Sequence, residues 1–294
     1  MLNYYLHAEN AKQALAALAK GLTSVELSID LNLSQQSFSL NDQGLILDED
    51  NQLSIDELKY IAKKKQKIFL CCDGDFDPLE DRSSGYYKLV PTAGSPLLEI
   101  SGVKMHISKG TDPFKSASEM AQQAVHSGDK VLDCCSGLGY AAIAAHRLGA
   151  REVLSIELSP EVMALRAQNP WSNDLGKEGI TQLQGSSYEL IGTMPSNSFD
   201  SVIHDPPRFS LAGELYSEEF YSQIFRVLRR NGRLFHYTGN PHLLRKGSSF
   251  VDGVIRRLKS AGFKKVEKVD HLMGVSAQKW FNFETGLKNS AVVT

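Results

Sequence analysis

The sequence predicts an α/β protein in which a mostly parallel sheet follows a small α+β domain. From Lys130 onward, short apolar runs alternate with helical patterns, and two final apolar runs lie at 264–269 and 275–281. Strands that alternate with helices are joined by right-handed crossovers and lie parallel in one sheet. The two final runs predict a closing antiparallel hairpin. We therefore expect a domain at 1–96 and a second at 97–294.

The amino-terminal hundred residues alternate apolar and polar positions over short stretches, which predicts antiparallel strands. The expected strands lie at 24–31, 37–40, 44–47, 67–70 and 86–90, and a hairpin pairs 97–100 with 103–107. The first twenty residues predict an amphipathic helix. A second helix starts after Ser54, which forms a capping box with Glu57, and a third is expected at 114–126.

The second half predicts a seven-stranded sheet. Its strands are expected at 130–134, 152–157, 180–184, 199–204, 232–238, 264–269 and 275–281, with helices near 140–148, 160–168, 214–229 and 248–261. Ligands of such sheets bind beyond the carboxyl ends of the strands. Asp133, Glu157, Ser186 and Asp205 all fall at or just after such ends.

Composition excludes several classes of protein. The 294 residues are 42% hydrophobic, enough for a full core, and carry a net charge of −2, too small to draw the chain to nucleic acid by a global field. No apolar run reaches the ~20 residues that span a bilayer, so we expect a cytoplasmic protein with no membrane partner. The adjacent cysteine pairs, Cys71-Cys72 and Cys134-Cys135, lack zinc-ligand spacing, so we expect reduced thiols and no metal site.

A glycine turn indicates a nucleoside ligand. Asp133-Cys134-Cys135-Ser136-Gly137-Leu138-Gly139 reads as a strand end and a turn, and Glu157 closes the next apolar run 24 residues after Asp133. Gly137 and Gly139 can take a positive φ and let the backbone approach a ligand. An acid at this distance suits ribose hydroxyls. Tyr140 and Ala141 follow where a dinucleotide fingerprint needs a third glycine, which argues against NAD.

This motif, together with Glu157, resembles those of the class I S-adenosylmethionine-dependent methyltransferases, over roughly residues 112 to 280. The resemblance implies a Rossmann-like sheet of seven strands and S-adenosylmethionine as cofactor. It implies that the turn cradles the methionine part of the cofactor and that Glu157 binds its ribose. It also places Ser186 near the adenine. The implied cofactor-binding residues are Asp133, Ser136, Gly137, Gly139, Glu157, Ser186 and Asp205.

A second motif, Asp205-Pro206-Pro207-Arg208, follows the apolar run 199–203. Two prolines remove two backbone donors, which predicts carbonyls at 204–206 that are free to face a ligand. The motif resembles the Asp/Asn-Pro-Pro-aromatic sequence of methyltransferases that modify amino nitrogens. The resemblance implies that Asp205, Pro206 and Pro207 hold the acceptor amine. Arg208 stands where those enzymes have a ring, and we count it among the catalytic residues because its guanidinium could stack on a base or pair with a carboxylate or phosphate. Phe209 follows it and could supply the ring.

The whole pattern also resembles a group of archaeal-type methyltransferases with this motif, for which the acceptor stays open between an RNA and a small amine. Two other interpretations compete. The run after Asp205 resembles spermidine synthases, which implies an aminopropyltransferase that uses decarboxylated S-adenosylmethionine, although Val202 stands where that family has a paired aspartate. A non-catalytic cofactor-binding or RNA-binding module is the other, and the intact Asp205-Pro206-Pro207 turn argues against it. The sequence does not fix the oligomeric state.

Two further sets of residues have two interpretations each. Asn169-Pro170-Trp171 could cover an adenine or end a helix with Trp171 in the core. His106 and His204 are candidate bases, although a lone histidine more often has a structural role.

Overall fold

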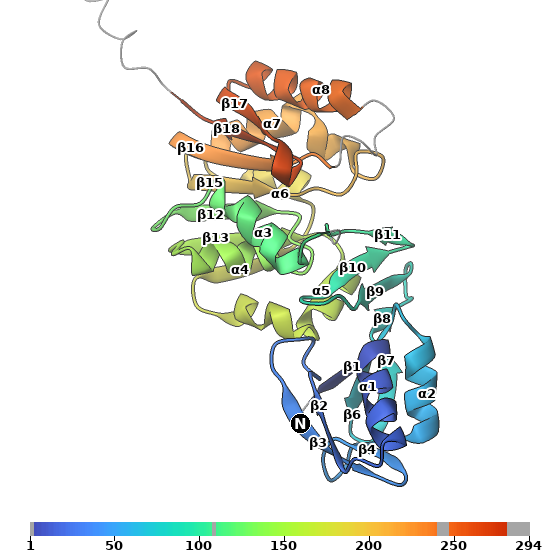
Figure 1. The fold of residues 1–294 in the computed structure, drawn as a ribbon. Coiled ribbons are helices and arrows are strands. Elements are labelled where there is room, and N and C mark those ends of the chain that lie inside the picture. Colours follow the sequence, from blue (N-terminus) through green and yellow to red (C-terminus); the bar gives the residue numbers. More distant parts are fainter. Residues whose placement is uncertain (1–2, 108–109, 240–246, 281–294) are drawn as a thin grey trace, which may run out of the picture. The chain divides into compact units, whose positions relative to one another are not determined.

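The structure is a computed structural model that describes residues 3–107, 110–239 and 247–280. It divides into two compact units, described separately below (Figure 1). The first comprises Met1–Ser116, Gly137–Tyr140 and Ser159–Gly176, and the second comprises Ala117–Ser136, Ala141–Leu158 and Lys177–Thr294. The domain boundary at residue 96 stays a prediction.

The first unit contains two antiparallel sheets near the amino terminus. The elements are β1 (Tyr4–His7), α1 (Ala8–Ala19), β2 (Ser24–Leu27), β3 (Gln36–Asn41), β4 (Gly44–Ile46), β5 (Gln52–Ser54), α2 (Ile55–Lys63), β6 (Ile68–Cys72) and β7 (Asp75–Pro78). The sheet orders are β1-β6-β7 and β2-β3-β4-β5. Apolar residues of α1, α2 and both sheets share one core, which includes Leu6, Ala14, Leu45 and Leu58. The predicted capping box forms, because Ser54 Oγ accepts from the Glu57 amide while the Glu57 carboxylate accepts from the Ser54 amide.

The same unit contains a third antiparallel sheet in the order β11-β10-β9-β8. Its strands are β8 (Glu80–Asp81), β9 (Tyr87–Val90), β10 (Leu97–Ile100) and β11 (Val103–Lys104), and the unit also holds α5 (Pro160–Ala167) and the 3-10 helix η1 (Pro170–Gly176). The predicted hairpin around residues 101 and 102 is present, with both residues at positive φ.

The second unit is built on a seven-stranded sheet in the order β14-β13-β12-β15-β16-β18-β17. The strands are β12 (Lys130–Cys134), β13 (Glu152–Glu157), β14 (Ile180–Gln184), β15 (Phe199–His204), β16 (Leu228–Tyr237), β17 (Lys264–Val269) and β18 (Gly274–Gln278). β12 to β16 pair in parallel, and β18 runs antiparallel to both β16 and β17. The predicted fold class is therefore confirmed, with its closing hairpin.

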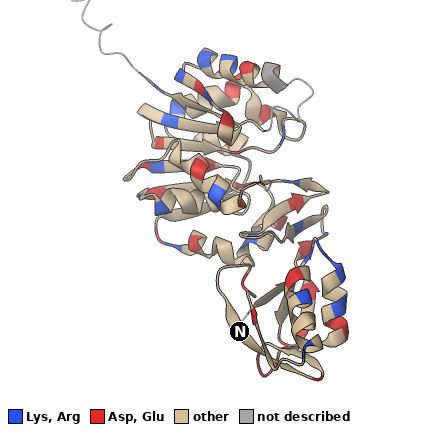
Figure 2. Ribbon diagram, in the orientation of Figure 1, with Lys and Arg blue, Asp and Glu red and all other residues tan. Residues whose placement is uncertain are grey.

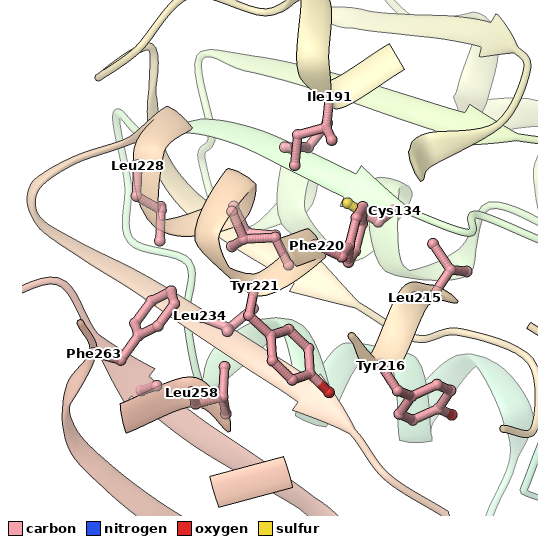
Figure 3. Close-up of a cluster of buried hydrophobic side chains, with 14 of the residues drawn as sticks. Cys134, Ile191, Leu215, Tyr216, Phe220, Tyr221, Leu228, Leu234, Leu258 and Phe263 are labelled. Atoms are coloured by element: carbon pink, nitrogen blue, oxygen red, sulfur yellow. The ribbon is translucent and has the colours of Figure 1, made fainter. Parts of the chain in front are cut away.

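Helices on one face of this sheet enclose the main core (Figure 3). The elements that line this core are α6 (Ser187–Thr193), η2 (Gly213–Tyr216), α7 (Glu218–Val227) and α8 (Gly247–Ser260). The chain also forms α3 (Pro113–Gln122), α4 (Tyr140–Arg147) and η3 (Asp270–Leu272). The core joins Leu132, Val202 and Leu234 of the strands to side chains of α6, α7 and α8, including Ile191, Phe220, Tyr221 and Leu258. Burial of large apolar side chains from three helices holds this face of the sheet rigidly.

Several boundaries differ from the predictions. The expected helix over 214–229 is split into η2 and α7, because Ser217 adopts an extended conformation and caps α7 through the amide of Phe220. The expected first helix is preceded by β1, whose four residues are all buried. Strands β5, β7 and β8 and helix α6 are too short for their periodicity to reveal them. Residue 281 of the last expected strand lies outside the described residues.

The distribution of charged residues agrees with the small net charge of the sequence. Acidic and basic residues lie on the same elements, as on α2 and α8 (Figure 2). Among the described residues, no helix is long and apolar enough to cross a membrane. The cytoplasmic location stays a prediction. All four cysteines are free thiols.

Candidate active site

Four predicted site residues follow the carboxyl ends of four adjacent strands. In sheet order, Ser186 follows β14, Glu157 ends β13, Asp133 lies near the end of β12 and Asp205 follows β15 directly. These strands run parallel, so their carboxyl ends meet at one edge of the sheet. The second unit therefore carries three carboxylates and one hydroxyl along one edge.

The side chain of Asp133 is fully buried at this edge. Asp133 pairs with Ser155 in the neighbouring strand, and the Ser155 hydroxyl lies 3.3 Å from Asp133 Oδ2 and 2.6 Å from Ser136 Oγ. Ser136 also anchors its own backbone, because its amide donates to the Ile156 carbonyl at 2.8 Å. These contacts fix the start of the glycine turn against β13.

The glycine turn has a backbone that few other residues could adopt. Cys135, Gly137 and Gly139 have φ values of +70°, +53° and +80°. A Cβ on Gly139 would lie 2.4 Å from Leu175 Cδ1, whereas a Cβ on Gly137 would meet nothing within 4 Å. Packing therefore requires glycine at 139. At 137 the direction in which a Cβ would point is open, while the Gly137 carbonyl accepts from Arg166 Nη1 at 3.3 Å.

Glu157 and Ser186 are linked through the backbone. The Gly185 amide donates to the Glu157 carbonyl at 2.8 Å. Ser186 caps α6, since its hydroxyl accepts from the Glu189 amide at 3.4 Å. The Glu157 side chain is buried at the edge of the sheet. A carboxylate and a capped helix start thus lie at the ends of neighbouring strands.

Asp205 is half-buried, and burial together with the negative charge of Asp133 raises its pKa to about 7. Pro206 is buried and Pro207 is partly buried, whereas Arg208 and Phe209 are exposed. The prediction of a free carbonyl at 204 is wrong, because the His204 carbonyl accepts from His236 Nδ1 at 3.2 Å. The next carbonyl beyond the predicted group, that of Pro207, accepts from the Tyr216 hydroxyl at 2.9 Å.

The other candidates have structural roles. Trp171 Nε1 donates to the Leu31 carbonyl at 2.7 Å, and the Asn169 amide donates to the hydroxyls of Tyr140 and Ser172, both at 2.9 Å. Burial lowers the pKa of His106 and of His204 to about 4. His204 Nε2 donates to the Leu215 carbonyl at 2.9 Å. Within the described part of the chain, no group of three or more potential ligands could hold a metal ion.

Comparison with known proteins identifies the family. Residues 132–236 match the family described as "Methyltransferase domain". An uncharacterized protein of Methanocaldococcus jannaschii is 42% identical over 279 residues, which cover 94% of this chain and 95% of that protein. The chain belongs to the class I S-adenosylmethionine-dependent methyltransferases. The matched range runs from β12 to β16 and so includes both predicted motifs, Glu157 and Ser186, but not His106.

The chain is also similar, more distantly, to two other proteins. The ribosomal protein L11 methyltransferase of Shouchella clausii is 29% identical over 178 residues, which cover 60% of this chain and about half (51%) of that enzyme. The spermidine synthase of Thermotoga maritima has the same sheet, with a TM-score of 0.53 at 18% identity over 68% of this chain and 72% of that one. At this identity the second likeness concerns the fold alone.

The residues of the methyltransferase fit its cofactor. S-adenosylmethionine carries two ribose hydroxyls, an adenine amino group, and a methionine part with a carboxylate, an ammonium group and a sulfonium. The Glu157 carboxylate is suited to accept from the hydroxyls, and the Ser186 hydroxyl can accept from an amino group.

Proposed function

We propose that this methyltransferase methylates an amino nitrogen that Asp205 and the Pro206-Pro207 turn hold. The observation that carries the proposal is the position of Asp205, which directly follows β15 and precedes two prolines. Burial and the charge of Asp133 there raise its pKa to about 7. A carboxylate accepts hydrogen bonds from an amine, and a pKa near neutrality suits a group that also takes the proton of the attacking nitrogen. Asp133 and Glu157 end the two next strands and complete the negative edge of the site.

The bound cofactor supplies a methyl group on a positively charged sulfur, so attack by a nitrogen lone pair requires mainly alignment. Asp205 would orient the acceptor N–H and receive its proton as the N–C bond forms and the methyl C–S bond breaks, which would leave the cofactor as the thioether S-adenosylhomocysteine. A covalent route through Cys135 is disfavoured. Burial, with smaller contributions from Cys134 and the nearby carboxylates, raises the pKa of the Cys135 thiol well above its usual value, and a protonated thiol is a poor nucleophile.

The aminopropyltransferase alternative needs a second acid beside Asp205. Val202 occupies the corresponding position, and its side chain is fully buried in the core with those of α6 and α7. A carboxylate could not replace it there without an unpaired buried charge. The buried position of Val202 therefore supports a single acceptor-binding acid, Asp205, and so favours methyl transfer over aminopropyl transfer.

The experiment is methyl transfer from radiolabelled S-adenosylmethionine to cell extract divided into RNA, protein and small-molecule fractions. We expect label in one fraction, and mass spectrometry of its hydrolysate should place the methyl group on nitrogen. Label on carbon or oxygen would exclude the proposal.

Two variants connect the reaction to the site. Asp205→Ala should slow transfer by about 100-fold or more while calorimetry gives nearly unchanged cofactor affinity. Asp252→Ala removes an exposed carboxylate that pairs with Lys268 at 2.7 Å and should keep full activity. Equal activity of the two variants would remove Asp205 from the mechanism.

A further inference from the structure

The Asp205-Pro206-Pro207 turn is held from both ends by side-chain donors. Neither proline has an N–H, so the backbone at 206 and 207 can accept hydrogen bonds but cannot donate them. His236 Nδ1 lies 3.2 Å from the His204 carbonyl, just before Asp205. The Tyr216 hydroxyl donates to the Pro207 carbonyl at 2.9 Å. The two bonds bracket the three residues of the turn.

The donor at the first end has a defined tautomer. A carbonyl only accepts, so His236 Nδ1 must carry the proton of the neutral ring. Nε2 is then an acceptor, and the Tyr221 hydroxyl donates to it across 2.9 Å. Burial lowers the pKa of His236 well below its usual value, with a smaller effect from His204, which keeps the ring neutral. Tyr221 and His236 are both fully buried, so water does not compete for these bonds.

The donor at the second end, Tyr216, is held in place by His204, the residue just before the turn. His204 Nε2 donates to the Leu215 carbonyl at 2.9 Å, and Leu215 directly precedes Tyr216. The rings of His204 and His236 lie 4.5 Å apart, and those of Tyr216 and His236 lie 5.3 Å apart. Hydrogen bonds and ring contacts therefore connect His204 of β15, His236 of β16 and Tyr216 of η2. Both ring nitrogens of His236 are hydrogen-bonded, which favours a single arrangement of this ring.

We propose that His236 and Tyr216 are positioning residues that clamp the Asp205-Pro206-Pro207 turn and so hold the Asp205 carboxyl at the edge of the sheet. The proposal rests on the role given to Asp205 above. Neither positioning residue needs to touch a substrate. Their effect reaches the reaction through the place and the partial burial of one carboxylate.

The test is the titration of the Asp205 carboxyl by carbon NMR in protein labelled at aspartate carboxyls, without cofactor or acceptor. Asp205→Asn assigns the signal. In the native protein we expect titration near pH 7, as burial and Asp133 predict. Tyr216→Phe removes one hydroxyl and keeps the ring, so the loosened turn should expose the carboxylate and lower its pKa by about one unit or more.

Two controls separate clamping from a general loss of a buried hydrogen bond. Tyr4→Phe removes a buried tyrosine hydroxyl that donates to Asp48 at 2.7 Å in the first unit and should leave Asp205 unchanged. If Tyr216→Phe does not fold, the His236 pair provides the same test. His236→Leu removes the donor and should lower the Asp205 pKa. His236→Asn retains an N–H near the position of Nδ1, so the Asp205 pKa in this variant should be close to that of the native protein.

Unchanged titration in Tyr216→Phe and His236→Leu, or a native Asp205 that titrates near its ordinary value of 3.8, would overturn the clamp. The readout needs no acceptor. Failure to find an N-methylated product would therefore count against the proposed function alone, because it would leave the titration result intact.

Discussion

Asp133 lies one residue before the end of β12 and Asp205 directly follows the neighbouring parallel strand β15, and the charge of Asp133 adds to burial in raising the pKa of Asp205 to about 7. Two acids at adjacent strand ends therefore differ in environment. Asp133 is fully buried beside Ser155, whereas Asp205 is half-buried and precedes two prolines. The difference leaves Asp205 able to change its protonation near neutral pH.

This relationship makes stability depend on pH. Asp205 has a higher pKa in the folded protein than its ordinary 3.8, so its favourable contribution is complete below about pH 3.8 and is lost as the pH rises through about 7. Asp205→Asn should therefore be more stable than the native protein at pH 8, by about 2 to 4 kcal/mol. Urea unfolding at pH 8 and at pH 4 measures the effect, and a gain of equal size at both pH values would contradict it.

The two glycines of the turn should respond differently to alanine. Gly139→Ala adds a Cβ 2.4 Å from Leu175 Cδ1 at a φ of +80°, so we expect a loss of about 2 to 4 kcal/mol. Gly137→Ala meets open space at a φ of +53° and should cost only about 1 to 2 kcal/mol. Chemical denaturation of the two variants provides the comparison. Equal losses would show that φ alone, and not packing on Leu175, sets the requirement at 139.

Glu157 should contribute to cofactor affinity. Glu157→Ala removes the carboxylate at the end of β13 and should weaken S-adenosylmethionine binding by about 1.5 to 3 kcal/mol, roughly tenfold or more. Glu152→Ala serves as control, since Glu152 starts the same strand and pairs with Lys130. Calorimetric titration measures both affinities. Unchanged binding in folded Glu157→Ala would show that the ribose lies elsewhere.

The sheet and the predicted site residues followed from the sequence for one physical reason. Parallel strands place their carboxyl ends at one edge, so strand ends read from apolar runs also located Asp133, Glu157 and Asp205. Short elements such as α6 carry too few residues for a period to appear. The clamp around Asp205 could not be predicted, because Tyr216 and His236 reach it through tertiary packing. The one sequence feature that points toward this clamp is Tyr221, a tyrosine on an apolar helix face, because a buried hydroxyl needs a hydrogen-bond partner.

The carboxylate of the cofactor distinguishes the methyltransferase from an aminopropyltransferase built on the same fold. The residues 134–136 contribute two cysteines and a serine, with no acid among them to repel a ligand carboxylate. Backbone N–H groups at the start of α4 (Tyr140–Arg147) favour a negative charge. We expect S-adenosylmethionine to raise the unfolding temperature more than decarboxylated S-adenosylmethionine at equal concentration, because stabilisation grows with ligand affinity. A scan with both compounds, and with S-adenosylhomocysteine as a control that keeps the carboxylate, makes the measurement. A larger shift with the decarboxylated compound, or release of methylthioadenosine when a polyamine is added, would favour aminopropyl transfer and require that a single acid at 205 suffices to hold the amine.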